Sequence, residues 1–340
     1  MKKVNNREKS LNLSDIGEFG LIKLLVDKIQ PSKMLDGGIG DDVAIVKHSA
    51  NKWLLLTTDS LIEDSHFKKN WFKPFSLGKK AAAINLSDIS SKGGTPKYAL
   101  ISLGLPFDLK TSFVDKLYDG LISEFSKAKV QIVGGNITRS TKILIDIFLV
   151  GEIKPKMAVL RSTAKIGDLV LHTGFLGEAR AGFKILEKGL QKESSLLERF
   201  LKPKPRLKEG QILAERKLVS SMMDISDGLW QDLGMLCQAS SVGVELWQNK
   251  IFLSEKLKKA GKILNMDPLK LALQGGEDYE LLFTCKKKNA DKIKKMLKSK
   301  TNIKVSIIGK IKPLSYGRKI VNKDRKQSEI FIKGWDHFKK

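Results

Sequence analysis

Residues 74–106 read PFSLGKKAAAINLSDISSKGGTPKYALISLGLP, and this stretch indicates the fold class. The run from Ser76 to Ser91 is rich in Ala and Leu and predicts a helix, which Gly93–Gly94 ends before Pro96. The run Tyr98–Leu103 that follows predicts a strand. A helix that leads directly into a strand is typical of an α/β protein.

The same alternation continues along the rest of the chain, with seven predicted helices and nine predicted strands. The helices are Glu18–Ile29, Ser76–Ser91, Leu109–Ala128, Glu178–Lys188, Leu207–Lys217, Leu229–Ala239 and Ala290–Leu297. The strands are Val43–Val46, Trp53–Thr58, Tyr98–Leu103, Val130–Val133, Ile143–Val150, Leu169–His172, Met222–Ile225, Tyr279–Thr284 and Ile303–Ile308. A junction at Gly151–Arg161, which contains Pro155, divides the chain into predicted domains 1–152 and 153–340.

Length and composition favour a globular protein of two domains. The chain has 340 residues, of which 41% are hydrophobic and 29% charged. No apolar run approaches the roughly 18 residues that cross a bilayer, and the polar N-terminus MKKVNNREKSLNLSD has no apolar signal segment. Cys237 and Cys285 lie outside any CxxC motif and fit a reducing compartment. We therefore expect a cytoplasmic protein without structural zinc.

The net charge of +25 raises the question of nucleic-acid binding. Only 9 of the 62 basic residues are Arg, the residue that makes bidentate contacts to phosphates and bases. The lysine clusters at 256–262 and 286–298 alternate with apolar residues at helical spacing, which is typical of a solvated helix face. We therefore expect no nucleic-acid partner and keep a nucleic-acid binder only as an alternative. The positive field is expected to attract an anionic nucleotide.

Five acidic motifs at turns rich in Gly or Ser indicate the chemistry. They are GGIGDD at 37–42, TTDS at 57–60, NLSD at 85–88, DISDG at 224–228 and GGEDYE at 275–280. Carboxylates together with substrate phosphates are the usual ligands of Mg²⁺, and glycine lets the backbone approach a phosphate closely. The sequence contains neither a P-loop nor the motifs of a protein kinase. The motifs therefore predict phosphoryl transfer at a site with several Mg²⁺ ions and a nucleotide.

Local geometry supports this interpretation. Asp224 and Ser226 are two apart at a strand end, so they share one face, and Asn85 and Asp88 share a helix face. Asp59 ends an apolar strand. The histidines His48, His66, His172 and His337 have no partnered nucleophile motif. A phosphate acceptor needs none, because its oxygen is already anionic at neutral pH.

Eight motifs in their order along the chain resemble the thiamine-monophosphate kinase family, over Gly17 to Phe338. They are GGIGDDVAIV, TTDSLIEDSHF, NLSDISSKGGTPKYALISLGLP, VGGNITR, LRSTAKIGD, DISDGLWQDLG, GGEDYELLFT and KGWDHF. The resemblance implies a two-domain PurM-like fold of the α/β (α+β) class. Residues 1–152 would form a mixed sheet with helices that binds ATP and Mg²⁺ and makes a homodimer, and residues 153–340 an α/β domain that completes the site. The implied reaction transfers the γ-phosphoryl group of ATP directly to thiamine monophosphate.

The resemblance also implies roles for individual residues. The metal-ligand positions are Asp42, Thr57, Thr58, Asp59, Asp88, Asn136, Asp224 and Asp227, and the catalytic set is Asp42, Asp59, Asp88 and Asp227. The ATP-binding positions are Gly135, Asn136, Arg161 and Ser226, and the thiamine-contacting positions are His66, Glu277 and Trp335. A Trp face attracts a cation such as thiazolium.

One position departs from the family pattern, because Asn136 stands where the family has a metal-binding Asp. Asn ligates through its carbonyl oxygen but brings no charge, which predicts weaker or fewer metals there. Two further alternatives therefore stay open: another ATP-dependent enzyme of the same superfamily, or a weakened homologue that binds without turnover. Selenophosphate synthetase is disfavoured because no Cys precedes Cys237, and the related purine enzyme lacks the GGEDYEL and GWDHF pair.

Overall fold

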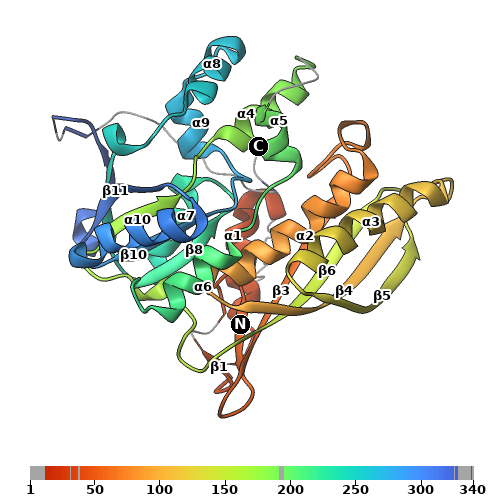
Figure 1. Ribbon diagram of the computed structural model, residues 1–340, viewed down its shortest axis with the longest axis horizontal. Coiled ribbons are helices and arrows are strands. Elements are labelled where there is room, and N and C mark those ends of the chain that lie inside the picture. Colours follow the sequence, from red (N-terminus) through yellow and green to blue (C-terminus); the bar gives the residue numbers. More distant parts are fainter. Residues whose placement is uncertain are drawn as a thin grey trace, which may run out of the picture.

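The computed structural model contains two six-stranded sheets with helices packed on them (Figure 1). It describes residues 12–30, 32–36, 39–190, 195–324, 326–327 and 338. The first sheet has the order β1-β2-β3-β6-β4-β5, and only β4 and β5 run parallel. Its strands are β1 (Leu35–Asp36), β2 (Ala44–Lys47), β3 (Trp53–Ile62), β4 (Thr95–Leu105), β5 (Gln131–Arg139) and β6 (Leu144–Ile153).

The first sheet is covered by helices on one face only. Its central strands alternate buried and more exposed residues, the pattern of a sheet with one packed face. The buried side chains pack under α2 (Pro74–Ser91) and α3 (Thr111–Lys127). These two helices approach so closely at Gly78 that a Cβ there would lie 2.0 Å from the carbonyl oxygen of Leu117. Glycine, which has no Cβ, permits this approach. The other face of the sheet carries no helix in Figure 1.

The second sheet has the order β12-β9-β11-β7-β10-β8 and is buried on both faces. Every residue of β8 and β10 is buried, as expected for strands between two helical layers. One layer is formed mainly by α4 (Glu178–Glu187), α7 (Leu229–Ala239), α8 (Glu255–Leu264) and α9 (Pro268–Gln274), and the other by α6 (Leu207–Glu215) and α10 (Lys287–Thr301). The strands are β7 (Leu169–Thr173), β8 (Ser221–Ile225), β9 (Gly243–Trp247), β10 (Glu280–Cys285), β11 (Val305–Lys312) and β12 (Arg318–Val321).

The remaining elements complete the two halves. The helices are α1 (Leu13–Val26), α4 (Glu178–Glu187), α5 (Ser195–Leu201), α6 (Leu207–Glu215), α7 (Leu229–Ala239), α8 (Glu255–Leu264), α9 (Pro268–Gln274) and α10 (Lys287–Thr301). Four short 3-10 helices are η1 (Lys69–Trp71), η2 (Arg161–Thr163), η3 (Gln248–Lys250) and η4 (Leu314–Tyr316).

Helix α2 contacts both halves of the molecule. It packs on β3 and β6 of the first sheet and also on β8 and α6 of the second half. Lys80 of this helix pairs with Glu277 of the second half, and Asp88 accepts a hydrogen bond from Thr57 of the first sheet. This position makes α2 one wall of any site between the halves.

Each predicted helix and strand has a counterpart in the structure, with ends that differ by a few residues. The predicted helix Glu18–Ile29 is α1, which begins earlier and has a non-helical residue at Gly17, where φ is 69°. Six elements were not predicted: β1, α5, β9, α8, α9 and β12. The predicted boundary between residues 152 and 153 remains a prediction; the first sheet ends at Ile153 and the second begins at Leu169.

Candidate functional site

A pocket of about 440 Å³ lies between the two halves of the molecule. Acidic residues from both halves line it, namely Glu18, Asp59, Asp88, Asp227 and Glu277. Ser226 and His66 line the same pocket. The structure therefore brings together six of the residues singled out in the sequence, from segments more than 200 positions apart.

The carboxylates at one end of the pocket repel one another. Burial and the neighbouring charge of Asp227 raise the pKa of Asp59 to about 7. Burial and the charge of Asp59 raise the pKa of Asp88 well above its usual value. Asp224, fully buried at the end of β8, has its pKa raised to about 7 by burial and by Asp42. Such a cluster lacks positive charge, and a divalent cation would supply it.

Hydrogen bonds fix the orientation of these carboxylates. Thr57 donates to Asp88 at 2.5 Å, and Ser87 of α2 donates to Asp224 at 2.5 Å. Asp227 accepts from Gln231 Nε2 at 3.2 Å. Asp88, Asp224 and Asp227 are thus each held by a neutral donor, which does not compensate a negative charge.

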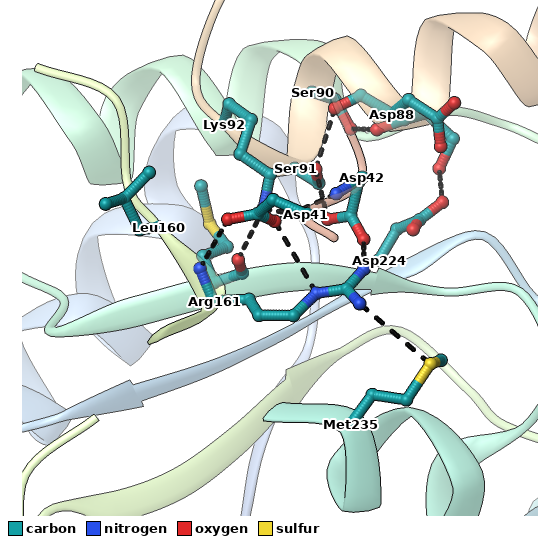
Figure 2. Close-up of polar contacts among 12 residues, drawn as sticks. Asp41, Asp42, Asp88, Ser90, Ser91, Lys92, Leu160, Arg161, Asp224 and Met235 are labelled. Atoms are coloured by element: carbon teal, nitrogen blue, oxygen red, sulfur yellow. Dashed lines mark hydrogen bonds and ion pairs between the residues drawn. The ribbon is translucent and has the colours of Figure 1, made fainter. Parts of the chain in front are cut away.

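Asp42 is paired differently, because two cations of the chain already neutralise it (Figure 2). Lys92 Nζ lies 2.8 Å from Asp42 and 2.7 Å from Asp41, and the Arg161 guanidinium pairs with Asp42 as well. Burial alone would raise the pKa of Asp42, but the charges of Lys92 and Arg161 lower it to about 2. Ser91 also donates to Asp42 at 2.7 Å. Asp42 therefore lies beside the acidic cluster as part of an ion-pair network.

The start of α7 carries Asp227 and is stabilised by a carboxylate that the sequence analysis missed. Asp232 is fully buried, and its Oδ2 accepts from the backbone N–H of Asp227 at 3.2 Å and of Gly228 at 3.1 Å. Burial and the charge of Asp227 raise the pKa of Asp232 well above its usual value. The DISDGLWQD run contains this residue, but only the folded turn reveals its partners.

The donor set fits a hard divalent cation, although no three acidic, His or Cys groups in the described part of the chain already stand at metal-ligand geometry. The fit comes from the chemistry of the residues. Asp59, Asp88 and Asp224 offer carboxylate oxygens as metal ligands, and burial together with neighbouring carboxylates raises the pKa of each. A bound cation would stabilise their ionised forms. Thr57 contributes a hydroxyl beside them.

The opposite end of the pocket is less acidic and partly apolar. Phe183, Phe200, Met266 and Leu271 line it together with Arg180 and Lys270. Glu277 projects here, and Lys80 Nζ lies 2.9 Å from its Oε2. His66 accepts a hydrogen bond from the backbone N–H of Ile62 through Nδ1 at 3.0 Å. Trp335, the third predicted thiamine-contacting residue, lies outside the described residues.

The structure does not bring Asn136 to the acidic cluster within this chain. Asn136 pairs in register with Ser102 of β4, which pairs with Asp146 of β6 and so with Ser60 of β3. This row lies on the helix-free face of the first sheet, whereas Thr57 and Asp59 point to the helix-covered face. Three strand spacings of about 4.8 Å put Asn136 roughly 14 Å across from β3.

Two other predicted residues of the first sheet, Thr58 and Gly135, also do not line the pocket. Thr58 is exposed on the same face and donates to Asp146 at 3.2 Å. Gly135 lies on β5, where a Cβ would stand 1.8 Å from the carbonyl oxygen of Ile101. The close approach of β4 and β5 is therefore a structural reason for glycine at this position.

Comparisons with known proteins agree with this arrangement. Residues 40–153 match the family model described as AIR synthase related protein, N-terminal domain, and residues 165–321 match the model for its C-terminal domain. The thiamine-monophosphate kinase of Aquifex aeolicus (strain VF5) is 42% identical over 278 residues, which are 81% of this chain and 87% of the relative. That of Bacillus subtilis (strain 168) is 30% identical over 95% of this chain and 99% of the relative. The chain belongs to the thiamine-monophosphate kinase family.

Solved structures of the thiamine-monophosphate kinase family have the same fold. A structure described as AaThiL complexed with AMPPCP and TMP superposes with a TM-score of 0.84 at 38% identity, covering 97% of this chain and 99% of that one. The hydrogenase maturation protein HypE of E. coli, 18% identical, shares the fold with a TM-score of 0.71 over 84% of this chain and 88% of that one. The predicted family and the two-domain PurM-like α/β fold are confirmed.

The described part of this family member has no helix with both the length and the apolar character needed to cross a membrane. Sequence reasoning found the acidic motifs, because glycine and aspartate at turns are visible in one dimension. It missed Lys80, Lys92 and Asp232, because their partners lie far away in the chain or are backbone groups.

Proposed function

We propose that this protein is a kinase that transfers the γ-phosphoryl group of ATP to thiamine monophosphate, giving thiamine diphosphate and ADP. The observation that carries the proposal is the pocket in which Asp59, Asp88 and Asp227 face a less acidic end that contains Glu277. Relatives at 30–42% identity are named as thiamine-monophosphate kinases, and a solved relative was crystallised with AMPPCP, an ATP analogue, and TMP.

The reaction needs positioning more than it needs a nucleophilic side chain. An oxygen of the acceptor phosphate forms the new bond to the γ-phosphorus, and the bond between that phosphorus and the bridging oxygen of ADP breaks. The attacking oxygen is already anionic, so no general base is required. The task of the site is to hold two anions in line and to compensate their charge.

Mg²⁺ is part of the proposal, and the ligands we assign to it are Asp59, Asp88, Asp224, Asp227 and Thr57. The bound metal would supply charge neutralisation for the two phosphates. Asp42 is assigned to the same cluster, with its present partners Lys92 and Arg161 as competing cations. We retain Thr58 and Asn136 as proposed metal ligands. Both lie on the helix-free face of the sheet, but on β3 and β5, so within one chain they would serve separate metal positions.

ATP recognition is assigned to Arg161, Ser226, Gly135 and Asn136. Ser226 lines the pocket beside Asp227, and Arg161 lies next to Asp42. Gly135 and Asn136 lie across the sheet from them, so one chain alone does not provide a single ATP site from all four. Recognition of thiamine is assigned to Glu277 and His66 in the pocket, and to Trp335.

We propose a homodimer formed through the helix-free face of the first sheet. This face carries the apolar row Leu56, Val150 and Tyr98 and the neighbouring pair Phe148 and Leu100. Tyr98 is 45% exposed and Leu100 is 42% exposed, which is unusual for large apolar residues in central strands. A second copy would cover this face and bring a second Asn136 near the interface. The cytoplasm is the proposed compartment.

The test is an endpoint assay with purified protein, ATP, Mg²⁺ and thiamine monophosphate, followed by chromatography for thiamine diphosphate. We expect product that disappears when Mg²⁺ is omitted. The Asp227→Asn variant should lower kcat about 100-fold or more, because one metal and phosphate anchor is lost. Asp119→Asn on the outer side of α3 is the matched control and should retain wild-type kcat.

A second candidate, a protein that binds both ligands without turnover, is favoured by the single observation of Asn136. In that case calorimetry would detect binding of ATP and thiamine monophosphate by the wild-type protein while the assay gave no product. Activity gained by Asn136→Asp would then assign the loss to this position. Turnover by the wild-type protein would eliminate this candidate.

A further inference from the structure

Lys80 of α2 is a fully buried lysine beside the pocket. Its Nζ lies 2.9 Å from Glu277 Oε2 and donates to the carbonyl oxygen of Phe200 at 3.2 Å. The same ammonium lies 3.7 Å from the centroid of the Phe200 ring and 5.4 Å from that of Phe72. All these partners come from other elements, so the side chain is held in one position.

A buried ammonium is costly, because water no longer solvates its charge. Burial lowers the pKa of Lys80, and the charge of Glu277 raises it in part. Many buried ion pairs can be replaced by apolar residues of similar volume without loss of stability. A lysine at this point therefore calls for a role other than filling the core.

Glu277 differs from its two acidic neighbours in where its carboxylate points. Asp278 accepts from the backbone N–H of Gly177 at the start of α4, at 2.7 Å, and Glu280 pairs with Arg206. Both are buried within the second half of the molecule. Glu277 instead lines the pocket, with 28% of its side chain exposed. Of these three acidic residues, it is the one that a pocket ligand can reach.

Only one oxygen of the Glu277 carboxylate is used by Lys80. Oε2 accepts from Nζ, and Oε1 makes no hydrogen bond or ion pair to another residue in the described part of the chain. The backbone is fixed as well, because the Glu277 N–H donates to the Ser226 carbonyl at 2.7 Å. The carboxylate is therefore orientated on one side and open on the other.

Helix α2 connects this carboxylate with the acidic end of the pocket. Lys80, Ile84 and Asp88 follow one another at four-residue spacing and share a helix face. Ile84 and Asp88 line the pocket, and Lys80 lies one turn farther along, behind Glu277. One rigid helix thus fixes the separation between the proposed phosphate end and the Glu277 end.

We propose that Lys80 is a positioning residue that holds Glu277 toward the cationic ring of the phosphate acceptor, and so sets affinity for the acceptor and not for ATP. The inference rests on the proposed function. The fixed ammonium orientates one carboxylate oxygen, and the other oxygen faces the thiazolium cation. Arg180 also lines the pocket, and its charge interacts with that of Glu277.

The experiment is a double-mutant cycle with Lys80→Met, Glu277→Gln and the double variant. Each is assayed for kcat and for KM toward thiamine monophosphate and toward ATP. We expect Lys80→Met to raise KM for thiamine monophosphate about tenfold, the size of a lost charge-assisted contact, with KM for ATP within about twofold. KM for thiamine monophosphate in the double variant should not exceed the higher of the two single-variant values, because both changes remove the same interaction.

The matched control is Lys79→Met, the adjacent lysine, which pairs with Glu124 of α3 at 3.4 Å on another side of the helix. It should leave both KM values unchanged. Effects that multiply in the double variant, or equal increases in KM for both substrates, would overturn the proposal and make Lys80 a purely structural residue.

Two additional measurements test the positioning role of Lys80 in two cases: if Lys80→Met does not fold, and if the wild-type protein has no kinase activity. If Lys80→Met does not fold, Glu277→Asp retracts the carboxylate by one methylene without touching Lys80 and must give the same selective rise in KM. If the wild-type protein forms no thiamine diphosphate, the proposed function fails. Calorimetry with thiamine monophosphate alone then decides the role of Lys80: a tenfold weaker Kd for Lys80→Met supports positioning, and an unchanged Kd rejects it.

Discussion

At the scale of single residues, the acidic cluster and its counter-ions divide the site into two parts. Asp42 has its charge compensated by Lys92 and Arg161, whereas Asp59 and Asp88 have carboxylates as neighbours, and Asp88 has the neutral donor Thr57. The difference has a consequence for proton binding. With a pKa of about 2, Asp42 is ionised at neutral pH, whereas Asp59, with a pKa raised to about 7, keeps its proton to higher pH.

We predict that Asp59→Asn changes how stability depends on pH in metal-free buffer. The folded-state pKa of Asp59 is raised from 3.8 to about 7, so the folded state holds the proton more tightly than the unfolded chain. The contribution of the protonated Asp59 carboxyl group to the free energy of unfolding is fully present below about pH 4 and is lost as the pH rises toward 7. Relative to the wild type, Asp59→Asn should therefore gain on the order of 1 kcal/mol in unfolding free energy between pH 5 and pH 8.

Urea unfolding with a chelator at pH 5, 6, 7 and 8 measures this difference. Asp119→Asn, whose carboxylate is half exposed on α3, serves as the control and should follow the wild type at every pH. Parallel wild-type and Asp59→Asn profiles would show that Asp59 ionises normally in the folded protein.

Much of the cluster was predictable from sequence, because Asp59, Asp88 and Asp227 stand in motifs at the ends of well-patterned elements. The predicted ends of those elements lie close to the observed ends, and in the structure the three carboxylates line one pocket. The position of Asn136 was not predictable in the same way. A strand of known period specifies two faces, but which face receives the helices depends on packing between β4, β6 and α2.

At the scale of elements, the turn into α7 is the most constrained piece of the site. It must place Asp227 and Ser226 at the pocket while its first N–H groups lack helical partners. Asp232, five residues after Asp227, accepts from the backbone N–H groups of Asp227 and Gly228, which directly precede the first helical residue, Leu229. The helix thus supplies its own N-terminal acceptor.

We predict that Asp232→Leu lowers the unfolding free energy by about 2–3 kcal/mol, because two buried N–H groups lose their acceptor. It should also reduce kcat through displacement of Asp227. Asp232→Asn keeps a carbonyl acceptor and should cost less than about 1 kcal/mol. Chemical denaturation and the endpoint assay measure both effects, and equal losses for Asn and Leu would exclude the acceptor role.

Two of the elements that the sequence analysis did not predict, β9 and α8, show why they were difficult to recognise. Strand β9 contains Gly243 at its start and Trp247 at its end, and it joins the sheet between β11 and β12, whose pairing is set by distant segments. Helix α8 combines apolar and Lys residues, which was interpreted only as a solvated face. In the structure Leu257, Ala260 and Leu264 of this helix pack into the core of the second half.

At the scale of the whole molecule, the two sheets differ in how much of their surface is covered. The second is enclosed on both faces, and the first exposes Tyr98 and Leu100 on the face without helices. This asymmetry is the physical basis for the proposed dimer. It also gives a reason for Asn136 and Thr58 to lie away from Asp59, because a second copy would bring new groups to that face.

We predict that Leu100→Asp converts the protein from a dimer to a monomer and lowers its activity. A carboxylate in the centre of a buried apolar interface loses its hydration without a partner. Ile122→Asp on the outer side of α3, at 50% exposure, is the control and should leave the mass unchanged. Light scattering after gel filtration gives the result, and a monomeric wild type would rule out the dimer.

Helix α2 has a consequence for how the protein tolerates substitution. Thirteen of its 18 residues are buried, and its neighbours are the first sheet, α3, α6 and β8, so it has hardly any surface on which a change goes unnoticed. Larger residues at Gly78 meet the backbone of α3, and changes at Lys80 or Asp88 reach the pocket. A saturation library of this gene should therefore show nearly invariant codons at the 13 buried positions of α2 and at Asp88, within a permissive, lysine-rich surface.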